Sequence, residues 1–290
     1  MSNSSMPSEL RGFVQPGSGA GLVDVFRRRY LLSLLVRKEV QVRYRGSVLG
    51  WLWSYVKPTA QFIVFFLALG IFLKLNDSLE SYPIYLFSGL IVVNLFTEAF
   101  SNGTKSLVDN GALIKKIYLP RELFPVSATI VAFVNFLPQV FVTLVVCLIV
   151  GWEPQPLQLL GALLAMAIII VLSTGLGMLF GAVNVSFRDS QNFVELIALV
   201  ATWASPVLYP WTTVRDIFPD WLLTLYLLNP VTAAVELFHG AFWFPTTSGS
   251  NPQPPNLMLL GLIALGISFV VLAIGQLVFR RMESRFAQDL

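Results

Sequence analysis

The sequence predicts an all-α polytopic membrane protein with six transmembrane helices. Hydrophobic residues make up 56% of the 290 residues and charged residues only 12%, whereas soluble domains carry about 25% charged residues. The charges are confined to a few short stretches, so the long apolar runs between them must face lipid. The single cysteine, Cys147, lies inside an apolar run, which excludes a disulfide framework or a cysteine-based metal site within one chain.

The amino-terminal part of the chain divides into a tail and an interface segment. Residues 1–21 are rich in Ser, Gly and Pro and lack the apolar stretch of a signal peptide, so we expect a flexible tail. Residues 22–58 form the interface segment. Its first part, Leu22 to Val42, reads LVDVFRRRYLLSLLVRKEVQV and mixes apolar with basic residues at helical spacing. This pattern predicts an amphipathic helix lying in the membrane interface, and it fits a passive anchor as well as a functional surface.

Six apolar runs of about 20 residues are long enough to cross the hydrocarbon layer of a bilayer. They are Thr59–Leu75, Pro83–Phe100, Leu123–Val150, Leu157–Val183, Phe193–Pro210 and Leu257–Phe279. We therefore expect a six-span domain over residues 59–279, followed by a tail over residues 280–290.

Basic residues predict the orientation, because Lys and Arg accumulate on the cytoplasmic side of membrane proteins. With the amino terminus inside, only Lys74 and Arg215 among the lysines and arginines fall outside. An even number of spans places the carboxyl terminus inside as well. The basic balance of the chain thus reflects topology, and we expect no nucleic acid partner.

The segment before the first span carries the most specific pattern of the chain. Arg43 to Pro58 reads RYRGSVLGWLWSYVKP, in which aromatic residues suit the headgroup level, glycines permit a bend and Pro58 can begin the next helix. The headgroup-level candidates are Arg43, Arg45, Gly46, Gly50, Trp51 and Trp53. This segment resembles the amino-terminal motif of the type-2 ABC exporter permeases, especially the branch that exports cell-surface polysaccharides such as O-antigen, capsule, teichoic acid and galactan.

The resemblance covers most of the chain and implies a cytoplasmic coupling segment between spans two and three, here residues 104–122. Asp109 to Glu122, DNGALIKKIYLPRE, resembles the part that inserts into a groove on the ATPase subunit. The residues implied in this contact are Asp109, Leu113, Ile114, Lys115, Lys116, Ile117, Leu119, Pro120 and Arg121. By pattern alone, an ordinary positive-inside loop is the alternative. In the short loop of residues 184–192, Arg188 and Asp189 fit either a second contact with the same partner or a simple turn.

The chain offers no sign of its own catalysis. It contains no phosphate-cradling GxxxxGK[ST] sequence, so ATP and Mg are expected on a separate polypeptide and no cofactor is expected here. A single histidine rules out a histidine cluster for a metal, and no set of nucleophile, base and orienting residue is recognisable. Glu98 and Glu195 lie near predicted cytoplasmic helix ends, where we expect them to reach water or to pair with basic residues.

Between spans five and six, residues 211–256 are expected to enter and leave the membrane on the outer side. Two apolar pieces, Asp220–Leu228 and Val231–Phe244, are each too short to span, so a cavity or pore mouth is expected nearby. Asn229 can cap the second piece, with Pro230 in its first turn. The resemblance implies an outer gate here, and an interfacial pair that plugs the bundle is the alternative.

Several side chains are candidates for lining the channel and its gate, although an aromatic belt at the lipid interface also accounts for most of the aromatic ones. They are Trp203, Tyr209, Trp211, Glu236, Phe238, His239, Phe242 and Trp243. Glu236 and His239 share one helical face, where they either line the gate or make a local hydrogen bond.

The resemblance implies a permease subunit in the cytoplasmic membrane of a bacterium, with a second copy of itself and two ABC ATPase subunits as partners. The substrate implied is a polyprenyl-pyrophosphate-linked glycan, whose pyrophosphate is drawn from among the membrane lipids toward Arg43 or Arg45. A GxxxG at Gly177 and Gly181 favours close helix packing, either within one chain or between two. The alternatives are an ABC exporter of lipids or drugs and, in a different class, an ion-coupled secondary transporter. The lack of clustered carboxylates disfavours an intramembrane transferase.

Overall fold

The computed structural model describes residues 21–48, 50–117, 119–249 and 251–289. All regular secondary structure in these residues is helical. The expected tail lies outside the described residues except for Gly21. In chain order the helices are α1 (Leu22–Arg27), α2 (Arg29–Tyr44), α3 (Trp53–Phe65), α4 (Leu75–Ser78), α5 (Tyr82–Asp109), α6 (Gly111–Lys116), α7 (Leu123–Val150), α8 (Pro156–Ser186), α9 (Ser190–Trp203), α10 (Trp211–Ile217), α11 (Asp220–Leu228), α12 (Pro230–Phe242), α13 (Leu257–Met282) and α14 (Phe286–Asp289).

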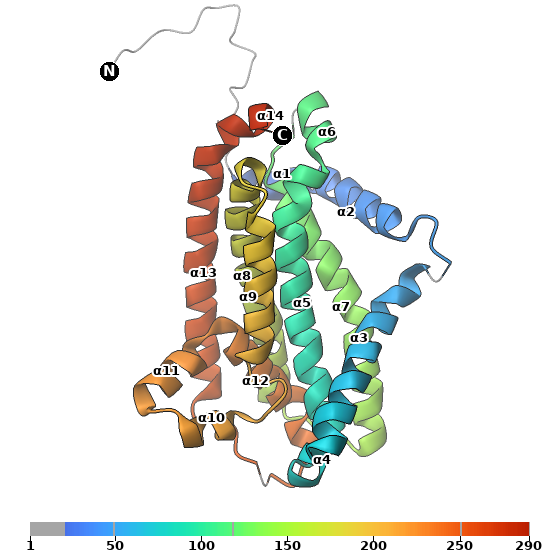
Figure 1. Ribbon diagram of the computed structural model, residues 1–290, viewed down its shortest axis with the longest axis vertical. Helices are drawn as coiled ribbons and strands as arrows, with labels where there is room; N and C mark the ends of the chain where they lie inside the picture. The colour runs from blue at the N-terminus through green and yellow to red at the C-terminus, as the bar shows by residue number, and fades with distance from the viewer. Residues whose placement is uncertain (1–20, 49, 118, 250, 290) are drawn as a thin grey trace, which may run out of the picture.

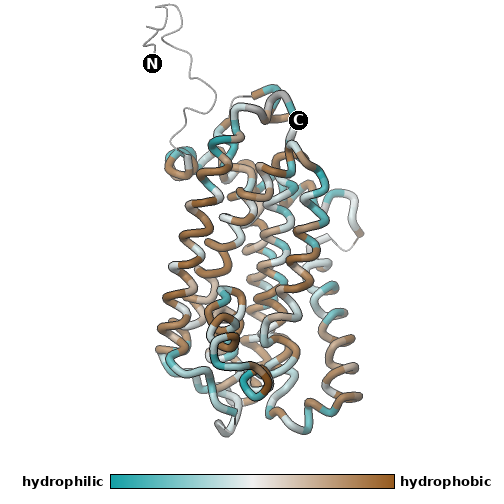
Figure 2. The backbone as a smooth tube through the Cα atoms, turned by 60° about the vertical axis from the view of Figure 1, so that its left-hand side comes forward, coloured by the Kyte–Doolittle hydropathy of each residue, from teal (hydrophilic) through white to brown (hydrophobic). Residues whose placement is uncertain are grey.

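The long helices form one bundle whose two ends carry different short elements. Helices α1, α2, α6 and α14 lie at one end, which we call the α6 end, and helices α4 and α10 lie at the other, the α10 end (Figure 1). Hydropathy follows the same division, with hydrophobic residues along the length of the bundle and hydrophilic stretches gathered at its ends (Figure 2). This is the distribution that a bilayer imposes on a spanning protein.

Five helices in the described part of the chain are long and apolar enough to cross a membrane. The first combines α3 with the π-helical stretch Phe66–Phe72 and spans Trp53 to Phe72, and the others are α5, α7, α8 and α13. All-α polytopic architecture is thereby confirmed. The expectation that Pro58 begins the first span is wrong, because the helix already starts at Trp53 and Pro58 lies inside it. A proline there removes one backbone donor but leaves the helix intact.

The fifth predicted span is shorter than expected. Helix α9 has only 14 residues and ends at Trp203, which is about 21 Å at 1.5 Å per residue, less than the ~30 Å of a hydrocarbon core. Turns and irregular backbone over residues 204–210 complete the passage to the α10 end (Figure 1). The hydroxyl of Tyr85 lies within hydrogen-bond distance of two carbonyl oxygens of this stretch, those of Pro206 and Tyr209, at 2.6 and 2.8 Å, and its one proton is donated to one of them at a time.

Helices α11 and α12 form a bent pair that enters and leaves at the α10 end. They are bent by 77°, and the Asn229 side chain accepts the backbone N–H of Val231 at 3.0 Å, as predicted for a cap. Before the pair, the indole of Trp211 donates to the Pro252 carbonyl at 2.8 Å. After the pair, the indole of Trp243 donates to the Glu80 carbonyl beside the start of α5 at 2.8 Å. Both ends of the segment are thus held at the same end of the bundle.

Helix α8 packs in the middle of the bundle through its glycines. A Cβ on Gly177 would lie 3.2 Å from the Cα of Gly103 in α5, and a Cβ on Gly181 would lie 3.2 Å from the Gly103 carbonyl oxygen. On another face of α8, a Cβ on Gly275 of α13 would lie 2.2 Å from the Gly175 carbonyl oxygen. The GxxxG contact therefore forms within one chain, and the backbones approach as closely as small residues permit.

We expect Gly275→Ala to destabilise the bundle, because the added methyl group would overlap the α8 backbone and overpacking typically costs about 1–3 kcal/mol. Gly266→Ala in the same helix is a matched control, since a Cβ there meets nothing within 4 Å. Thermal unfolding in detergent should show a lower transition temperature for Gly275→Ala only. Equal transition temperatures for the two variants would contradict the close α8–α13 contact.

Candidate functional site

A polar stripe runs along one face of α5 at the depth of the transmembrane bundle. Its residues recur at intervals of three and four, the spacing that places side chains on one face of a helix. They are Asn94, Thr97, Glu98, Ser101 and Asn102. The stripe faces α3 and α7, away from the glycine contacts that α5 makes with α8.

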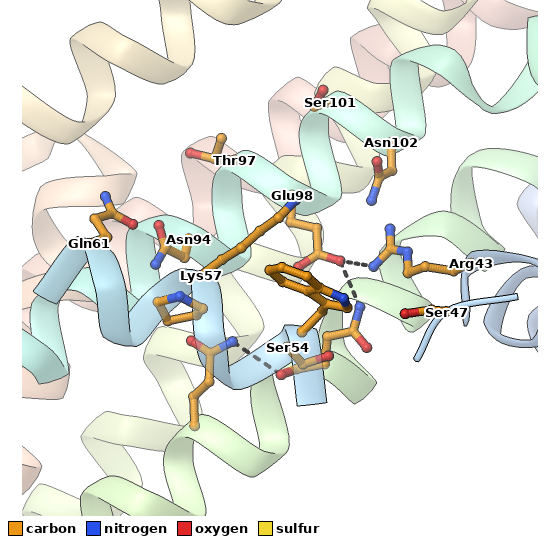
Figure 3. Close-up of a pocket in the computed structure, with 14 residues that line it drawn as sticks. Arg43, Ser47, Ser54, Lys57, Gln61, Asn94, Thr97, Glu98, Ser101 and Asn102 are labelled. Atoms are coloured by element: carbon orange, nitrogen blue, oxygen red, sulfur yellow. Dashed lines mark hydrogen bonds and ion pairs between the residues drawn. The ribbon is translucent and has the colours of Figure 1, made fainter. Parts of the chain in front are cut away.

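The stripe forms one wall of a cavity of about 780 Å³ between α3, α5 and α7 (Figure 3). Helix α7 contributes Asn135 and Gln139, one turn apart, and the end of α2 contributes Arg43. The remaining lining comes from α3 and the turn before it: Ser47, Trp53, Ser54, Lys57, Pro58 and Gln61. Amides and hydroxyls dominate this lining, so the cavity can exchange many hydrogen bonds with a polar guest.

An ion pair closes the end of the cavity that lies nearer to α2. The Arg43 guanidinium donates to the Glu98 carboxylate, and the Asn135 amide donates to the same carboxylate oxygen at 2.7 Å (Figure 3). Both charged side chains are about one-third exposed. A carboxylate at membrane depth is costly unless it is paired or faces water, and here Glu98 has a cation, an amide and an open cavity. The sequence interpretation that Glu98 pairs with a basic residue agrees with this contact.

A second, smaller cavity of about 240 Å³ adjoins the first and leads toward the α6 end. The two cavities share Arg43 and Asn102 as lining residues. Glu39, Asp109 and Asn110 line the smaller one near its outer limit. The Asn110 amide donates to Glu39 at 3.2 Å and to the Ser106 carbonyl at 2.9 Å, and the Lys38 ammonium donates to both Glu39 and Asn110. Polar lining residues therefore extend from Asp109 and Asn110 of the coupling segment to Arg43 and Asn102, which also line the larger cavity.

The other headgroup-level candidates lie in the connection between α2 and α3. Arg45 and Gly46 are exposed, and Gly46 and Gly50 have φ values of +75° and +46°, a left-handed conformation that glycine adopts without strain. Trp53 lines the larger cavity. The side chain of Trp51 lies outside the described part of the structure. Of this candidate set, the structure brings Arg43 and Trp53 to the cavity.

The coupling segment presents a narrower surface than the sequence interpretation assumed. Lys115, Lys116 and Ile117 are exposed at the end of α6. Leu113 and Leu119 are partly buried, and Ile114 packs into a hydrophobic cluster together with α1, α2, α7, α8 and α13. Pro120 is buried and Asp109 is exposed. Much of the apolar face of the segment is therefore turned toward the protein itself.

Arg121 is engaged inside the chain. Only 8% of the residue is exposed, its guanidinium donates to the Glu283 carbonyl, and it lies 5.6 Å above the Phe286 ring. Nearby, Gln276 of α13 donates to Glu122 at 3.2 Å. Burial raises the pKa of the Glu283 carboxyl, and the charge of Glu122 raises it further. Arg121 therefore connects the coupling segment to the carboxyl-terminal elements and is not part of an exposed charged surface.

Arg188 and Asp189 are both exposed in the three-residue turn between α8 and α9. The turn lies at the α6 end of the bundle (Figure 1). This placement fits a surface contact and a simple connection equally well.

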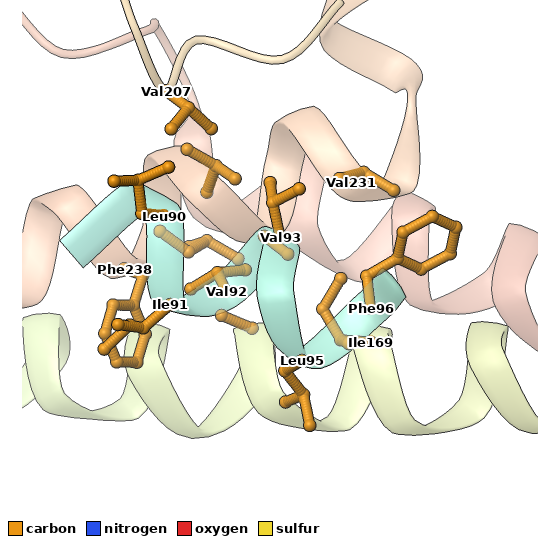
Figure 4. Packing of buried hydrophobic residues seen from close by; sticks show 14 of the residues in the cluster. Leu90, Ile91, Val92, Val93, Leu95, Phe96, Ile169, Val207, Val231 and Phe238 are labelled. Carbon is orange, nitrogen blue, oxygen red and sulfur yellow. The ribbon is translucent and has the colours of Figure 1, made fainter. Parts of the chain in front are cut away.

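The candidates for the channel and outer gate are mostly buried. Phe238, Phe242 and Trp243 pack in the main hydrophobic core, where Phe238 lies against α5 residues such as Ile91 (Figure 4). Glu236 and His239 are 4% and 1% exposed. Trp211 is buried and Tyr209 is partly buried. These residues therefore hold the α11–α12 pair in place in this conformation, while Trp203, 52% exposed, lies on the surface.

The polar cavity contains residues that sequence reasoning overlooked. Glu98 drew attention because it is charged, whereas its uncharged neighbours did not. A signal was present: Asn94, Thr97 and Ser101 share the helical face of Glu98, and Asn135 and Gln139 are four apart in the third apolar run. Amides repeated at helical spacing inside an apolar run indicate a face that avoids lipid.

Comparison with known proteins identifies the family. The ABC-2 type transporter family model matches residues 30–243, from α2 to the end of α12. The chain is 27% identical over 268 residues to the O-antigen export system permease protein RfbA of Myxococcus xanthus, covering 92% of this chain and 98% of that protein. It is 23% identical over 251 residues to the polysialic acid transport protein KpsM of Escherichia coli, covering 85% and 93% of the two chains. It is 24% identical over 257 residues to the capsule polysaccharide export inner-membrane protein CtrC of Neisseria meningitidis, covering 86% and 93%. The chain belongs to the ABC-2 type transporter family.

Proposed function

We propose that this chain is the permease subunit of an ATP-driven exporter that moves a lipid-linked cell-surface polysaccharide across the bacterial cytoplasmic membrane. The relatives named above are an O-antigen export system permease protein, a polysialic acid transport protein and a capsule polysaccharide export inner-membrane protein, and each is matched over more than nine-tenths of its length. The observation that carries the proposal in this chain is the cavity lined by amides and hydroxyls between α3, α5 and α7. Such a lining suits a hydroxyl-rich polymer better than an apolar drug.

The charged groups of the cavity suit the linkage between lipid and glycan. Arg43 and Lys57 both line it, and only Glu98 among the lining residues carries a negative charge. A pyrophosphate in the larger cavity would lie beside Arg43, and it can compete with Glu98 for the guanidinium. The polyprenyl chain would stay in lipid beside α3. The span formed by Trp53–Phe72 is only 11% buried by the rest of the chain.

Energy must come from another polypeptide, because the sequence lacks a phosphate-cradling motif. We propose that ATP and Mg bind to two ABC ATPase subunits that dock at the α6 end of two copies of this chain. Lys115, Lys116 and Ile117 are exposed at the end of α6 and would make the contact. The same arrangement places the α6 end, with both described chain ends, on the cytoplasmic side, in line with the lysines and arginines gathered there.

An ABC exporter of lipids or drugs is the second candidate, because the same membrane architecture can serve it. The polar stripe on α5 disfavours an apolar cargo. An ion-coupled transporter is less well supported, since Glu98 is neutralised by Arg43.

Depletion of the protein tests the cargo. We expect lipid-linked glycan to accumulate on the cytoplasmic side, because synthesis continues while export stops, and surface glycan to fall. Lipid-linked glycan is extracted from the cells and quantified, and glycan at the cell surface is quantified by surface labelling. Normal surface glycan accompanied by lost drug resistance would instead support the second candidate.

Reversing the charge of the coupling segment tests the ATPase contact. Lys115→Glu with Lys116→Glu should abolish copurification of the ATPase and lower export by about tenfold or more, because an exposed electrostatic contact becomes repulsive. Arg28→Glu with Arg29→Glu is the matched control, since both arginines are exposed at the same end and the charge change is equal. If the lysine variant still copurifies the ATPase at the wild-type ratio, the docking assignment is wrong.

Neutralising Arg43 tests the cavity. Arg43→Gln should lower export by about tenfold, because the variant loses both the cation for the pyrophosphate and the partner of Glu98, while the ATPase should copurify as before. Arg37→Gln is the control, as Arg37 is exposed on α2 and lines neither cavity. Equal rates of glycan export for the two variants would remove Arg43 from the pathway.

A further inference from the structure

The first turns of α5 connect two parts of the α10 end of the bundle. Tyr85 is 1% exposed and its hydroxyl lies within hydrogen-bond distance of the Pro206 and Tyr209 carbonyls, in the irregular stretch after α9. The ring of Tyr85 stacks on His239 of α12 with centroids 4.0 Å apart and makes an edge contact with Trp243 at 4.9 Å. One side chain of α5 therefore contacts both the passage after α9 and the re-entrant pair.

His239 makes a directed bond to the α5 backbone. Its Nε2 atom lies 3.0 Å from the Tyr85 carbonyl oxygen. A carbonyl oxygen only accepts hydrogen bonds, so Nε2 carries the proton and donates it. Gly89, one turn along α5, leaves the space for the imidazole, since a Cβ there would lie 2.8 Å from Nε2 and 3.3 Å from the Val207 Cα. Any other residue at this position would displace the ring or the backbone beside it.

The exit of the re-entrant pair is fixed to the same part of the chain. The Trp243 indole donates to the Glu80 carbonyl at 2.8 Å, and the Ser81 hydroxyl donates to the Thr246 carbonyl at 3.1 Å. The Glu80 carboxylate accepts from both the backbone and the hydroxyl of Ser248 at 2.7 Å. The pair thus moves with the start of α5 unless these bonds break.

The second nitrogen of His239 faces a carboxylate. With the proton on Nε2, the Nδ1 atom lies 3.9 Å from the Glu236 Oε1 atom, and neither atom has a hydrogen-bond partner among the described residues. The orientation of the His239 ring therefore rests on its Nε2 bond to the Tyr85 carbonyl and on its stack against the Tyr85 ring.

Helix α5 also carries the coupling segment. It runs without interruption for 28 residues from Tyr82 to Asp109, and α6 follows after Asn110. Its buried residues extend along nearly its whole length. The contacts of His239 and the coupling segment thus lie at opposite ends of one uninterrupted helix.

We propose that His239 is a positioning residue that locks the α11–α12 pair onto α5, so that movement of the coupling segment reaches the outer closure directly through this helix. This inference rests on the proposed function, which assigns the α6 end to the ATPase side and the α10 end to the outer side. The contact of His239 with α5 does not depend on that assignment. If the contact of His239 with α5 is broken, the complex should still hydrolyse ATP but should no longer close the α10 end. Damage to the coupling segment should instead abolish both activities.

Gly89→Ala tests the lock, with Gly266→Ala as the matched control because a Cβ at position 266 meets nothing within 4 Å. The complex is reconstituted in liposomes filled with calcein. Gly89→Ala should copurify the ATPase and hydrolyse ATP within about twofold of wild type, yet export about tenfold less glycan and release calcein severalfold faster. Wild-type export and a wild-type seal in Gly89→Ala would overturn the proposal.

Glu236→Gln provides a second readout that a merely structural role would not move. A glutamine amide can donate to the Nδ1 atom, which has no hydrogen-bond partner among the described residues, and so holds the ring in the orientation that bonds to Tyr85. Calcein release from Glu236→Gln should therefore be slower than release from wild type, whereas mere structural damage would make it faster. Release equal to or faster than that of wild type would contradict the lock, and this test decides the question if Gly89→Ala yields little folded protein.

Different results would contradict the proposed function and the lock. If no ATPase copurifies with the wild-type chain, the proposed function fails while the calcein profile of the chain alone still tests the lock. If the ATPase copurifies and glycan is exported, but neither Gly89→Ala nor Glu236→Gln changes calcein release as described, only the lock is wrong.

Discussion

Glycine-mediated contact between backbones is the constraint on which the arrangement of this bundle depends. Within a bilayer, apolar side chains gain little from leaving lipid for a helix interface, so association relies on close packing and hydrogen bonds. Helix α8 meets α5 at Gly103 and Gly177, and it meets α13 at Gly175 and Gly275, with no room for a Cβ at the tightest of these contacts. The face that α5 turns toward α8 is thereby fixed, and with it the direction of every other face of α5.

The polar stripe on α5 takes its position from that contact. With one face pressed on α8, the face that carries Asn94, Glu98 and Asn102 is directed toward α3 and α7, where it lines the larger cavity. Polar groups cannot be left in hydrocarbon without a large cost. The ion pair of Arg43 with Glu98 and the amides of α7 meet that requirement, and the cavity supplies the remainder with access to water or to a polar cargo.

Hydropathy and charge predicted most of the fold because a bilayer imposes length and polarity on each span. The re-entrant pair and the Asn229 cap followed from the same reasoning, since neither apolar piece is long enough to cross. The early end of α9 could not be predicted from its apolar run, because the irregular backbone that follows it is held by a tertiary hydrogen bond from the Tyr85 hydroxyl of α5. Local pattern likewise does not reveal that Arg121 bonds to the Glu283 carbonyl, 162 residues further along the chain.

The candidate site was predicted less completely than the fold. Charged residues such as Arg43 and Glu98 stand out in an apolar sequence, but their contact joins positions 55 residues apart, and only the packing of α2 beside α7 brings them together. Amides such as Asn135 are inconspicuous one by one and become meaningful when the helical face is known. Glu236 and His239 were expected either to line a gate or to make a local hydrogen bond, and the structure places both in the protein interior.

Transport by the purified complex is the direct test of polysaccharide export through this chain. The chain is reconstituted with its ATPase so that the α6 end faces the outside of the liposome, and lipid-linked glycan is supplied in the outer leaflet. On addition of ATP and Mg, we expect the glycan to become protected from an added glycosidase, at a rate that follows ATP hydrolysis. Glycan that remains fully accessible to the glycosidase while ATP is hydrolysed would contradict it.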